Sequence, residues 1–188
     1  MGYVLHLRSS TSLPFWEGLL QLVSNSSVET PTLLQKVRRH NSQTPTLEKL
    51  SRRYVRNDVL IEKIKELKTG EVLAISSRVE CIRPIQFMHL PMLDFHCKTS
   101  SSNDRLVRAV VLSLNLHGYI AHSGQSYHFY GSKLVDTQNL QAILSNALLV
   151  SPIVDRAWLA HQMIEGACGL RISPGKSYSA CPTIVDHI

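Results

Sequence analysis

An aspartate, two histidines and a serine lie at or near the ends of two apolar segments in the middle of the chain. Asp94 and His96 come directly after the apolar segment 85–93, and Ser126 and His128 belong to a second apolar segment. Because side chains alternate along a strand, Asp94 and His96 share one face, and so do Ser126 and His128. If the two strands are neighbours, a carboxylate, two imidazoles and a hydroxyl gather at one patch. Such a set suits a divalent metal ion and a phosphate group.

Asp94 and His96 are the candidate metal-binding and catalytic pair. A carboxylate and an imidazole two residues apart on a strand can share one divalent cation. The alternative is structural, with Asp94 capping the loop that follows and His96 partly exposed to solvent. The spacing leaves both interpretations open.

The segment Ser-Gly-Gln-Ser-Tyr-His, residues 123–128, is the candidate phosphate-binding element. Gly124 lets the backbone approach a phosphate closely, and the serine hydroxyls and the ring of His128 can donate hydrogen bonds to it. A glycine-containing hairpin turn is the structural alternative, and such turns are common.

These residues lie in a region of mixed helices and strands that runs from residue 70 to residue 188. Apolar spacing predicts strands over 71–79, 85–94, 119–122, 127–134, 169–173 and 182–185. It predicts a helix capped by Asn103 and closed by Gly118, a helix over 140–149 capped by Asp136, and a helix from Pro152 to Gly166. The expected fold class is therefore α+β.

Residues 1–69 form a basic region in which helices are expected. Candidate helices cover 14–23, 33–40, a segment beginning at Thr46, and 59–67. Between Lys36 and Lys68 there are ten Lys or Arg and four Asp or Glu, giving 10 − 4 = +6, the whole net charge of the chain. This charge indicates either a solvated helical face or a surface for a phosphate-rich partner, DNA or RNA. The candidate nucleic-acid-binding residues are Lys36, Arg38, Arg39, Arg52, Arg53 and Arg56.

Length and composition fit one globular domain with an N-terminal extension. The chain has 188 residues, and 44% of them are hydrophobic, which is enough for a packed core. No apolar run approaches the ~20 residues of a membrane-spanning helix, and no secretory signal is visible, so no membrane association is expected. The cysteines Cys81, Cys97, Cys168 and Cys181 lack CxxC spacing and fit reduced thiols in the cytoplasm.

The order of these motifs resembles that of the archaeo-eukaryotic primase superfamily, which includes the primase-polymerases. That family has an apolar strand ending in two acids one residue apart, a Ser-x-His strand after a small-residue turn, and another apolar strand ending in an acid. Met92-Leu93-Asp94-Phe95-His96 stands at the first position, Ser126-Tyr127-His128 at the second, and Gly169-Leu170-Arg171-Ile172-Ser173 at the third. Because His96 replaces the second acid and Ser173 the third, the first and third motifs are degenerate.

The resemblance covers residues 70–188 and implies a small RRM-like sheet, mixed or antiparallel, with helices packed on it and an N-terminal helical region before it. It implies that Asp94, with His96, binds Mg²⁺ or Mn²⁺. The implied nucleotide-binding residues are Ser123, Gly124, Ser126, His128, Arg171 and Ser173. The implied activity is metal-dependent nucleotidyl transfer from a nucleoside triphosphate on DNA or RNA, retained or reduced, alongside other replication, repair or defence proteins.

Two other functions stay open at this point. The losses of acids at His96 and Ser173 favour a non-catalytic subunit that binds nucleic acid or nucleotide within a larger complex. A metal-dependent nuclease or phosphoesterase would instead use a histidine-rich site composed of Asp94, His96, His122 and His128.

Overall fold

The structure is a computed structural model that describes residues 32–39, 46–50, 62–68, 71–82, 85–174 and 180–188. The described strands are β1 (Thr32–Arg39), β2 (Thr46–Leu50), β3 (Glu71–Ile82), β4 (Ile85–His89), β5 (Met92–Asp94), β6 (Gly118–His122), β7 (Tyr127–Gly131), β8 (Gly169–Arg171) and β9 (Thr183–His187). The described helices are α3 (Ser101–Ser113), α4 (Thr137–Leu148) and α5 (Arg156–Glu165).

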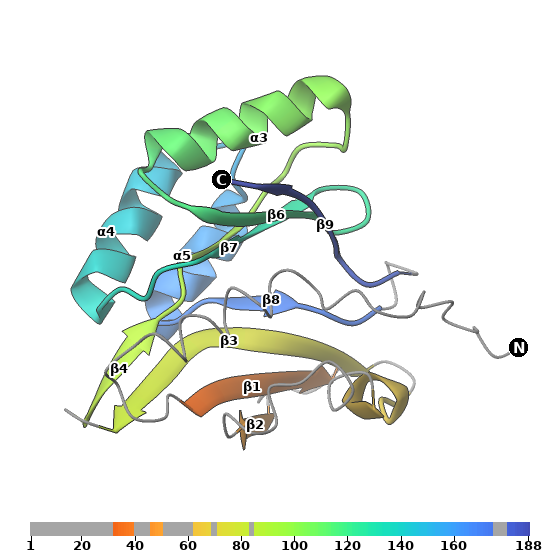
Figure 1. The fold of residues 1–188 in the computed structure, drawn as a ribbon, viewed down its shortest axis with the longest axis vertical. Coiled ribbons are helices and arrows are strands. Elements are labelled where there is room, and N and C mark those ends of the chain that lie inside the picture. The colour runs from red at the N-terminus through yellow and green to blue at the C-terminus, as the bar shows by residue number, and fades with distance from the viewer. Residues whose placement is uncertain (1–31, 40–45, 51–61, 69–70, 83–84, 175–179) are drawn as a thin grey trace, which may run out of the picture.

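The strands form two antiparallel sheets, which Figure 1 shows as separate layers. The five-stranded sheet has the order β2-β1-β3-β4, and β8 also pairs with β3. The four-stranded sheet has the order β5-β7-β6-β9, and α3 crosses it on the side away from the five-stranded sheet. The α+β prediction with antiparallel pairing is thus confirmed, although the strands divide between two sheets.

The segment predicted as one strand over 85–94 is instead two strands in different sheets. β4 pairs with β3 in the five-stranded sheet, whereas β5 pairs with β7 in the four-stranded sheet. The break falls at Pro91, which has no N–H to donate to a ladder. The N–H of Leu90 donates to the Ser77 carbonyl at 2.8 Å, and the Pro91 carbonyl accepts from Gly131 at 2.7 Å. The chain therefore passes from one sheet to the other at this proline.

The three helices begin at side-chain caps. Asp136 caps α4, as predicted, by accepting from the N–H of Asn139 at 2.7 Å. Two predicted starts were wrong: Ser100 rather than Asn103 caps α3, and Asp155 caps α5 after the predicted start at Pro152. Both true caps accept from the backbone N–H three residues on, the geometry that an N-cap requires. No helix within the described residues is long and apolar enough to span a membrane.

In the N-terminal region, two of the predicted helices were wrong. Residues 33–40 contribute the strand β1, and the segment from Thr46 begins with the strand β2. β1 pairs along β3 and β2 pairs along β1, so pairing with a long central strand overrides the local helical pattern. Residues 62–65 are helical, within the predicted helix 59–67. The helix predicted over 14–23 lies outside the described residues.

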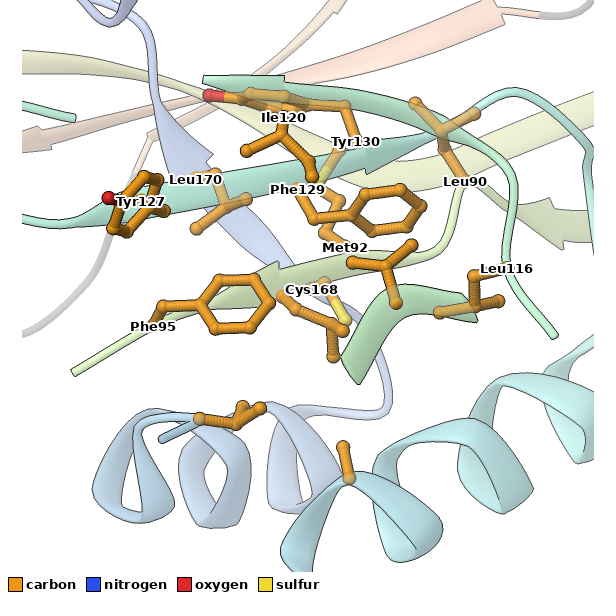
Figure 2. Close-up of a cluster of buried hydrophobic side chains, with 14 of the residues drawn as sticks. Leu90, Met92, Phe95, Leu116, Ile120, Tyr127, Phe129, Tyr130, Cys168 and Leu170 are labelled. Carbon is orange, nitrogen blue, oxygen red and sulfur yellow. The ribbon is translucent and has the colours of Figure 1, made fainter. Parts of the chain in front are cut away.

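One hydrophobic core joins the four-stranded sheet, its helices and the inner face of the five-stranded sheet. Figure 2 shows Met92, Phe129 and Leu170, from three strands, in one cluster beside the helices. Met92 and Phe129 are fully buried, and burying a side chain of this size contributes roughly 1.5–3 kcal/mol. The core fixes β5 against β7, and these two strands carry the residues that sequence reasoning singled out.

Candidate functional site

Asp94 and His128 face each other across two neighbouring strands. The register pairs Met92 with Tyr130, Leu93 with Phe129 and Asp94 with His128. The Oδ1 atom of Asp94 lies 3.7 Å from the Nε2 atom of His128, and their side chains are 27% and 6% exposed. The expectation that the two strands are neighbours is therefore confirmed.

The ring of His128 is neutral and fixed in orientation. Burial, together with the nearby positive charge of Arg171, lowers the pKa of His128 to about 3. Its Nδ1 atom lies 3.0 Å from the hydroxyl of Tyr130, whose O–H donates to the Arg171 carbonyl at 3.3 Å. With Nδ1 engaged in this way, Nε2 is the ring atom that faces the carboxylate.

Asp94 holds its proton more tightly than an ordinary aspartate. Burial and the like charge of Asp155 raise the pKa of Asp94 to about 7, against the opposing effects of Arg171 and the N–H of Phe95. At neutral pH the carboxyl group is thus about half ionised. A carboxylate in this state gains stability from any cation that reaches it.

Asp155 is the second carboxylate of the site, and sequence reasoning missed it. The N–H of Asp155 donates to the Asp94 carbonyl at 2.9 Å, the N–H of His96 donates to the Ile153 carbonyl at 2.7 Å, and Phe95 forms an isolated antiparallel bridge with Val154. Residues 153–155 thus run alongside β5 like a further strand. A short sequence signal for Asp155 exists, because the apolar residues Ile153 and Val154 come directly before it. An apolar segment that ends in an acid is the pattern expected of the third motif.

His96 lies on the exposed side of this cluster. Its side chain is 76% exposed, and its Nδ1 atom lies 3.7 Å from Oδ2 of Asp155. His96 therefore lies beside Asp155 rather than beside Asp94 alone.

The segment from Ser123 to Ser126 forms the hairpin turn between β6 and β7. The N–H of Ser123 donates to the Ser126 carbonyl at 2.8 Å, and Gly124 has a φ of 115°, which favours glycine. The Ser126 hydroxyl donates to the Phe95 carbonyl, so this turn is attached to the end of β5. Ser123 is buried, whereas Gly124 is exposed.

Arg171 and Ser173 bind the backbone of neighbouring segments. The guanidinium of Arg171 donates to the carbonyls of Ser123, Ser173 and Ala180. Ser173 is fully buried, and its hydroxyl accepts from the N–H of Leu73 and donates to the Pro174 carbonyl, both at 2.9 Å. Arg171 therefore brings a positive charge beside Asp94 and His128 while holding the hairpin turn.

The remaining predicted residues lie elsewhere or outside the described part of the chain. His122 does not join Asp94, because its Nε2 atom lies 3.4 Å from Oδ1 of Asp104 and its ring packs edge-on against Tyr127. Lys36, Arg38 and Arg39 belong to β1. Arg52, Arg53 and Arg56 lie outside the described residues.

The described residues contain no group of three or more His, Cys, Asp or Glu side chains arranged to hold a metal ion. Asp94 and Asp155 nevertheless form a pair of carboxylates whose mutual repulsion a cation would relieve. Oxygen atoms of this kind are the ligands that Mg²⁺ and Mn²⁺ prefer.

An α+β domain with an acid-ending strand beside a Ser-x-His strand is the arrangement expected of the primase-polymerase class. The model of the family described as AEP-like, archaeo-eukaryotic primase 1D-like, matches residues 51–183, and the chain belongs to this family. No curated protein and no solved structure matches the chain.

Proposed function

We propose that the site around Asp94 and His128 binds a nucleoside triphosphate and transfers its nucleotide to the 3′-hydroxyl of a DNA or RNA strand. The observation that carries the proposal is the pair of carboxylates, Asp94 and Asp155, beside the neutral imidazole of His128. In this transfer the hydroxyl attacks the α-phosphate and pyrophosphate leaves. Family membership supports the same class of function.

A single divalent ion fits the carboxylate pair. Mg²⁺ in nucleotide sites is commonly bound by one or two carboxylates together with substrate phosphates. Asp94 and Asp155, with His96 at the exposed side, would hold Mg²⁺ or Mn²⁺, which when bound offsets the negative charge of the phosphates. Binding would also draw Asp94 into its ionised form, because a nearby positive charge lowers the pKa of a carboxyl group.

The chain's other residues would position the nucleotide. His128 can donate from Nε2 to a phosphate oxygen in its Nε2–H tautomer, in which the O–H of Tyr130 turns from the Arg171 carbonyl to donate to Nδ1. Gly124 is an exposed residue of the hairpin turn, where backbone can approach a phosphate. Arg171 would contribute its positive charge from behind the turn, and Ser123, Ser126 and Ser173 would act through the backbone that they hold.

The nucleic-acid strand would contact the basic N-terminal region. The window from Lys36 to Lys68 carries the whole net charge, and Lys36, Arg38 and Arg39 lie on β1. We place the basic region at 1–69 and the catalytic core at 70–188, although β1 and β3 from either side of this boundary share a sheet. Other replication, repair or defence proteins in the cytoplasm would be the partners.

A non-catalytic subunit is the second candidate. His96 stands where the family has an acid, and the described residues lack a three-ligand metal group. Two carboxylates are fewer than two-metal phosphoryl transfer commonly uses. Such a subunit would bind nucleotide or nucleic acid without turning it over.

Primer extension tests these candidates directly. The full chain is incubated with a primed template, nucleoside triphosphates and Mg²⁺ or Mn²⁺, beside Asp94→Asn, Asp155→Asn and the control Asp186→Asn, whose carboxylate pairs with Arg108 on the opposite edge of the sheet. Extension that is lost in the first two variants and kept in the control supports nucleotidyl transfer. Salt-sensitive binding without extension supports the non-catalytic subunit, cleavage supports a nuclease, and absence of both binding and turnover contradicts the proposal.

A further inference from the structure

A cavity lies at the end of β5 away from Asp94. It has a volume of about 350 Å³ and lies between the end of α3, the loop after β7 and one face of α4. Pro91 lines it, whereas Asp94 is three residues further along the chain, which on a strand is about 10 Å away. Neither Asp94 nor His128 is among its lining residues. The cavity is therefore separate from the candidate nucleotidyl-transfer site.

The floor of this cavity is apolar and belongs to the rigid core. Pro91 and Leu116 are buried, and Val135 and Ile143 are partly buried. The cavity is as large as the smaller pockets that bind drug-sized molecules, which begin at about 300 Å³. Apolar side chains of this kind can pack against the face of a planar ring.

Polar side chains without protein partners surround this floor. Asn115, His117, Lys133 and Asn146 line the cavity, and within the described residues their side chains make no hydrogen bond. Asn139 also lines it, but its amide donates to the N-cap Asp136. Two amides, an imidazole and an ammonium group thus remain available to a ligand.

The backbone that carries these side chains is itself held in place before any ligand arrives. Asn115 has a φ of 55° at the end of α3, where its N–H donates to Leu112 at 2.9 Å and the N–H of Leu116 donates to Val111 at 3.1 Å. The N–H and hydroxyl of Ser132 both donate to the His117 carbonyl, which fixes the two segments that carry His117 and Lys133 side by side. A site that is rigid in advance loses less entropy on binding.

The charge of the cavity selects the ligand. Lys133 is the one charged side chain among the lining residues, and no Asp or Glu is among them. The nearest acid along the chain, Asp136, accepts from the N-terminus of α4. A ligand with an anionic group is therefore favoured over a cationic one. The asparagine amides add donors and acceptors that match the edge of a nucleobase.

We propose that this cavity is an accessory site for a nucleoside monophosphate. The base lies on the Pro91–Leu116 floor with its edge toward Asn115 and Asn146, and the phosphate lies at Lys133 and His117. The proposal is independent of the proposed function, because it uses none of the residues assigned to nucleotidyl transfer.

NMR titration of the full chain tests this site. The His128→Ala variant serves as the background, so that binding at the first site is weakened, and the added probes are AMP, adenosine and inorganic phosphate. We expect AMP to shift the backbone amide signals of Asn115, His117, Lys133 and Asn146, and to bind more tightly than adenosine or phosphate. Adding Lys133→Ala should weaken AMP about ten-fold, because a charge-assisted hydrogen bond is lost. Adding Ala142→Trp, on the exposed face of α4 that lines the cavity, should abolish the shifts.

Lys98→Ala is the matched control, because it removes an exposed lysine from outside the cavity lining with the same change in net charge. AMP binding that weakens in the Lys133 variant and not in the Lys98 variant supports the site. Phosphate binding as tightly as AMP, equal loss in both lysine variants, or no shift of these four signals would overturn it. If Ala142→Trp fails to fold, the lysine pair decides the matter alone.

Discussion

Two buried histidines, His89 and His128, differ in what their second ring nitrogen meets. His89 is 1% exposed, and its Nδ1 and Nε2 atoms lie 3.2 Å from the hydroxyls of Ser77 and Thr137. His128 is 5% exposed, with Nδ1 at Tyr130 but Nε2 3.7 Å from Asp94, beyond hydrogen-bond distance. Burial lowers the pKa of both rings.

The contrast teaches that burial and a shifted pKa do not by themselves mark a functional group. His89 has both nitrogens satisfied and joins β4 to β3 and α4, which is a structural task. His128 has one nitrogen directed at the carboxyl group of Asp94, whose pKa is raised in part by the like charge of Asp155. An incompletely satisfied pair of this kind costs stability unless a ligand completes it.

The strongest test of this contrast is Asp94→Asn, which changes the carboxyl group that faces Nε2 of His128. Because the folded-state pKa of Asp94 is raised to about 7, the folded protein binds its proton more tightly than the unfolded chain does. The Asp94 contribution to stability is therefore present below pH ~4 and lost as the pH rises toward 7. A shift of this size corresponds to at most about 4 kcal/mol.

We expect the asparagine variant to gain stability over wild type between pH 4 and 8, measured by urea unfolding at several pH values. Primer extension, where present, should fall by about 10³-fold, because several kcal/mol of charge stabilisation are lost. A difference in stability that does not change with pH would show that Asp94 is not strained in the folded protein.

Replacing His89 by alanine should have a smaller effect than the loss of primer extension expected for Asp94→Asn. It should act on stability alone. A buried and a partly buried hydrogen bond are lost, the Ser77 and Thr137 hydroxyls lose their partner, and a cavity remains, for about 3 kcal/mol in total. Nucleotide affinity of the folded fraction should be unchanged. Urea unfolding combined with calorimetric nucleotide titration measures both quantities, and a weaker nucleotide affinity at unchanged fold would remove the distinction between the two histidines.

Sequence reasoning could predict the Asp94–His128 pairing because both residues lie on short apolar strands with a side-chain period of two. If the strands are neighbours, residues at the ends of the two apolar segments lie near one another, and the observed register pairs Asp94 with His128. The helix caps were easier to predict where fewer candidates stand together. Asp136 has one favoured neighbour, Thr137, whereas Asn103 follows three serines, the first of which, Ser100, is the cap.

Asp155 and the strand β1 could not be placed in the same way, for physical reasons. Ile153 and Val154 are too few to show a strand period, and their pairing with 94–96 is a long-range contact that local pattern does not encode. In β1, Leu33, Leu34 and Val37 also have helical spacing, and only the presence of β3 decides for a strand.

His128→Ala should reverse the outcome expected for His89→Ala. Because one nitrogen of His128 is not satisfied by the protein, its removal should cost less stability than that of His89, one hydrogen bond being lost in place of two. Nucleotide affinity should weaken by roughly 1.5–3 kcal/mol, the value of a charge-assisted hydrogen bond to phosphate. Isothermal titration with a non-hydrolysable triphosphate measures the affinity, and an unchanged value would remove His128 from the site.

The smallest effect is expected at a third buried polar group, Tyr127, which precedes His128 on β7. Its ring is fully buried, its hydroxyl donates to Asp104 at 2.6 Å, and it accepts from the N–H of Ser100 at 3.0 Å. Burial and the hydrogen bond that the hydroxyl donates to Asp104 raise the pKa of Tyr127 to about 12. The hydroxyl therefore stays protonated across the physiological range. The polar end is thus satisfied in the manner of His89.

Tyr127→Phe keeps the ring and removes this hydroxyl alone, so that about 1 kcal/mol of stability should be lost, with nucleotide affinity unchanged. Thermal unfolding and the same titration as for His128→Ala measure the two effects. Tyr127 and His128 are adjacent on β7, and yet one should affect only stability and the other mainly binding. If Tyr127→Phe weakens nucleotide binding as much as His128→Ala does, the site extends across both faces of β7. In that case, whether a buried polar group has all its hydrogen-bond partners does not tell structural groups from functional ones in this protein.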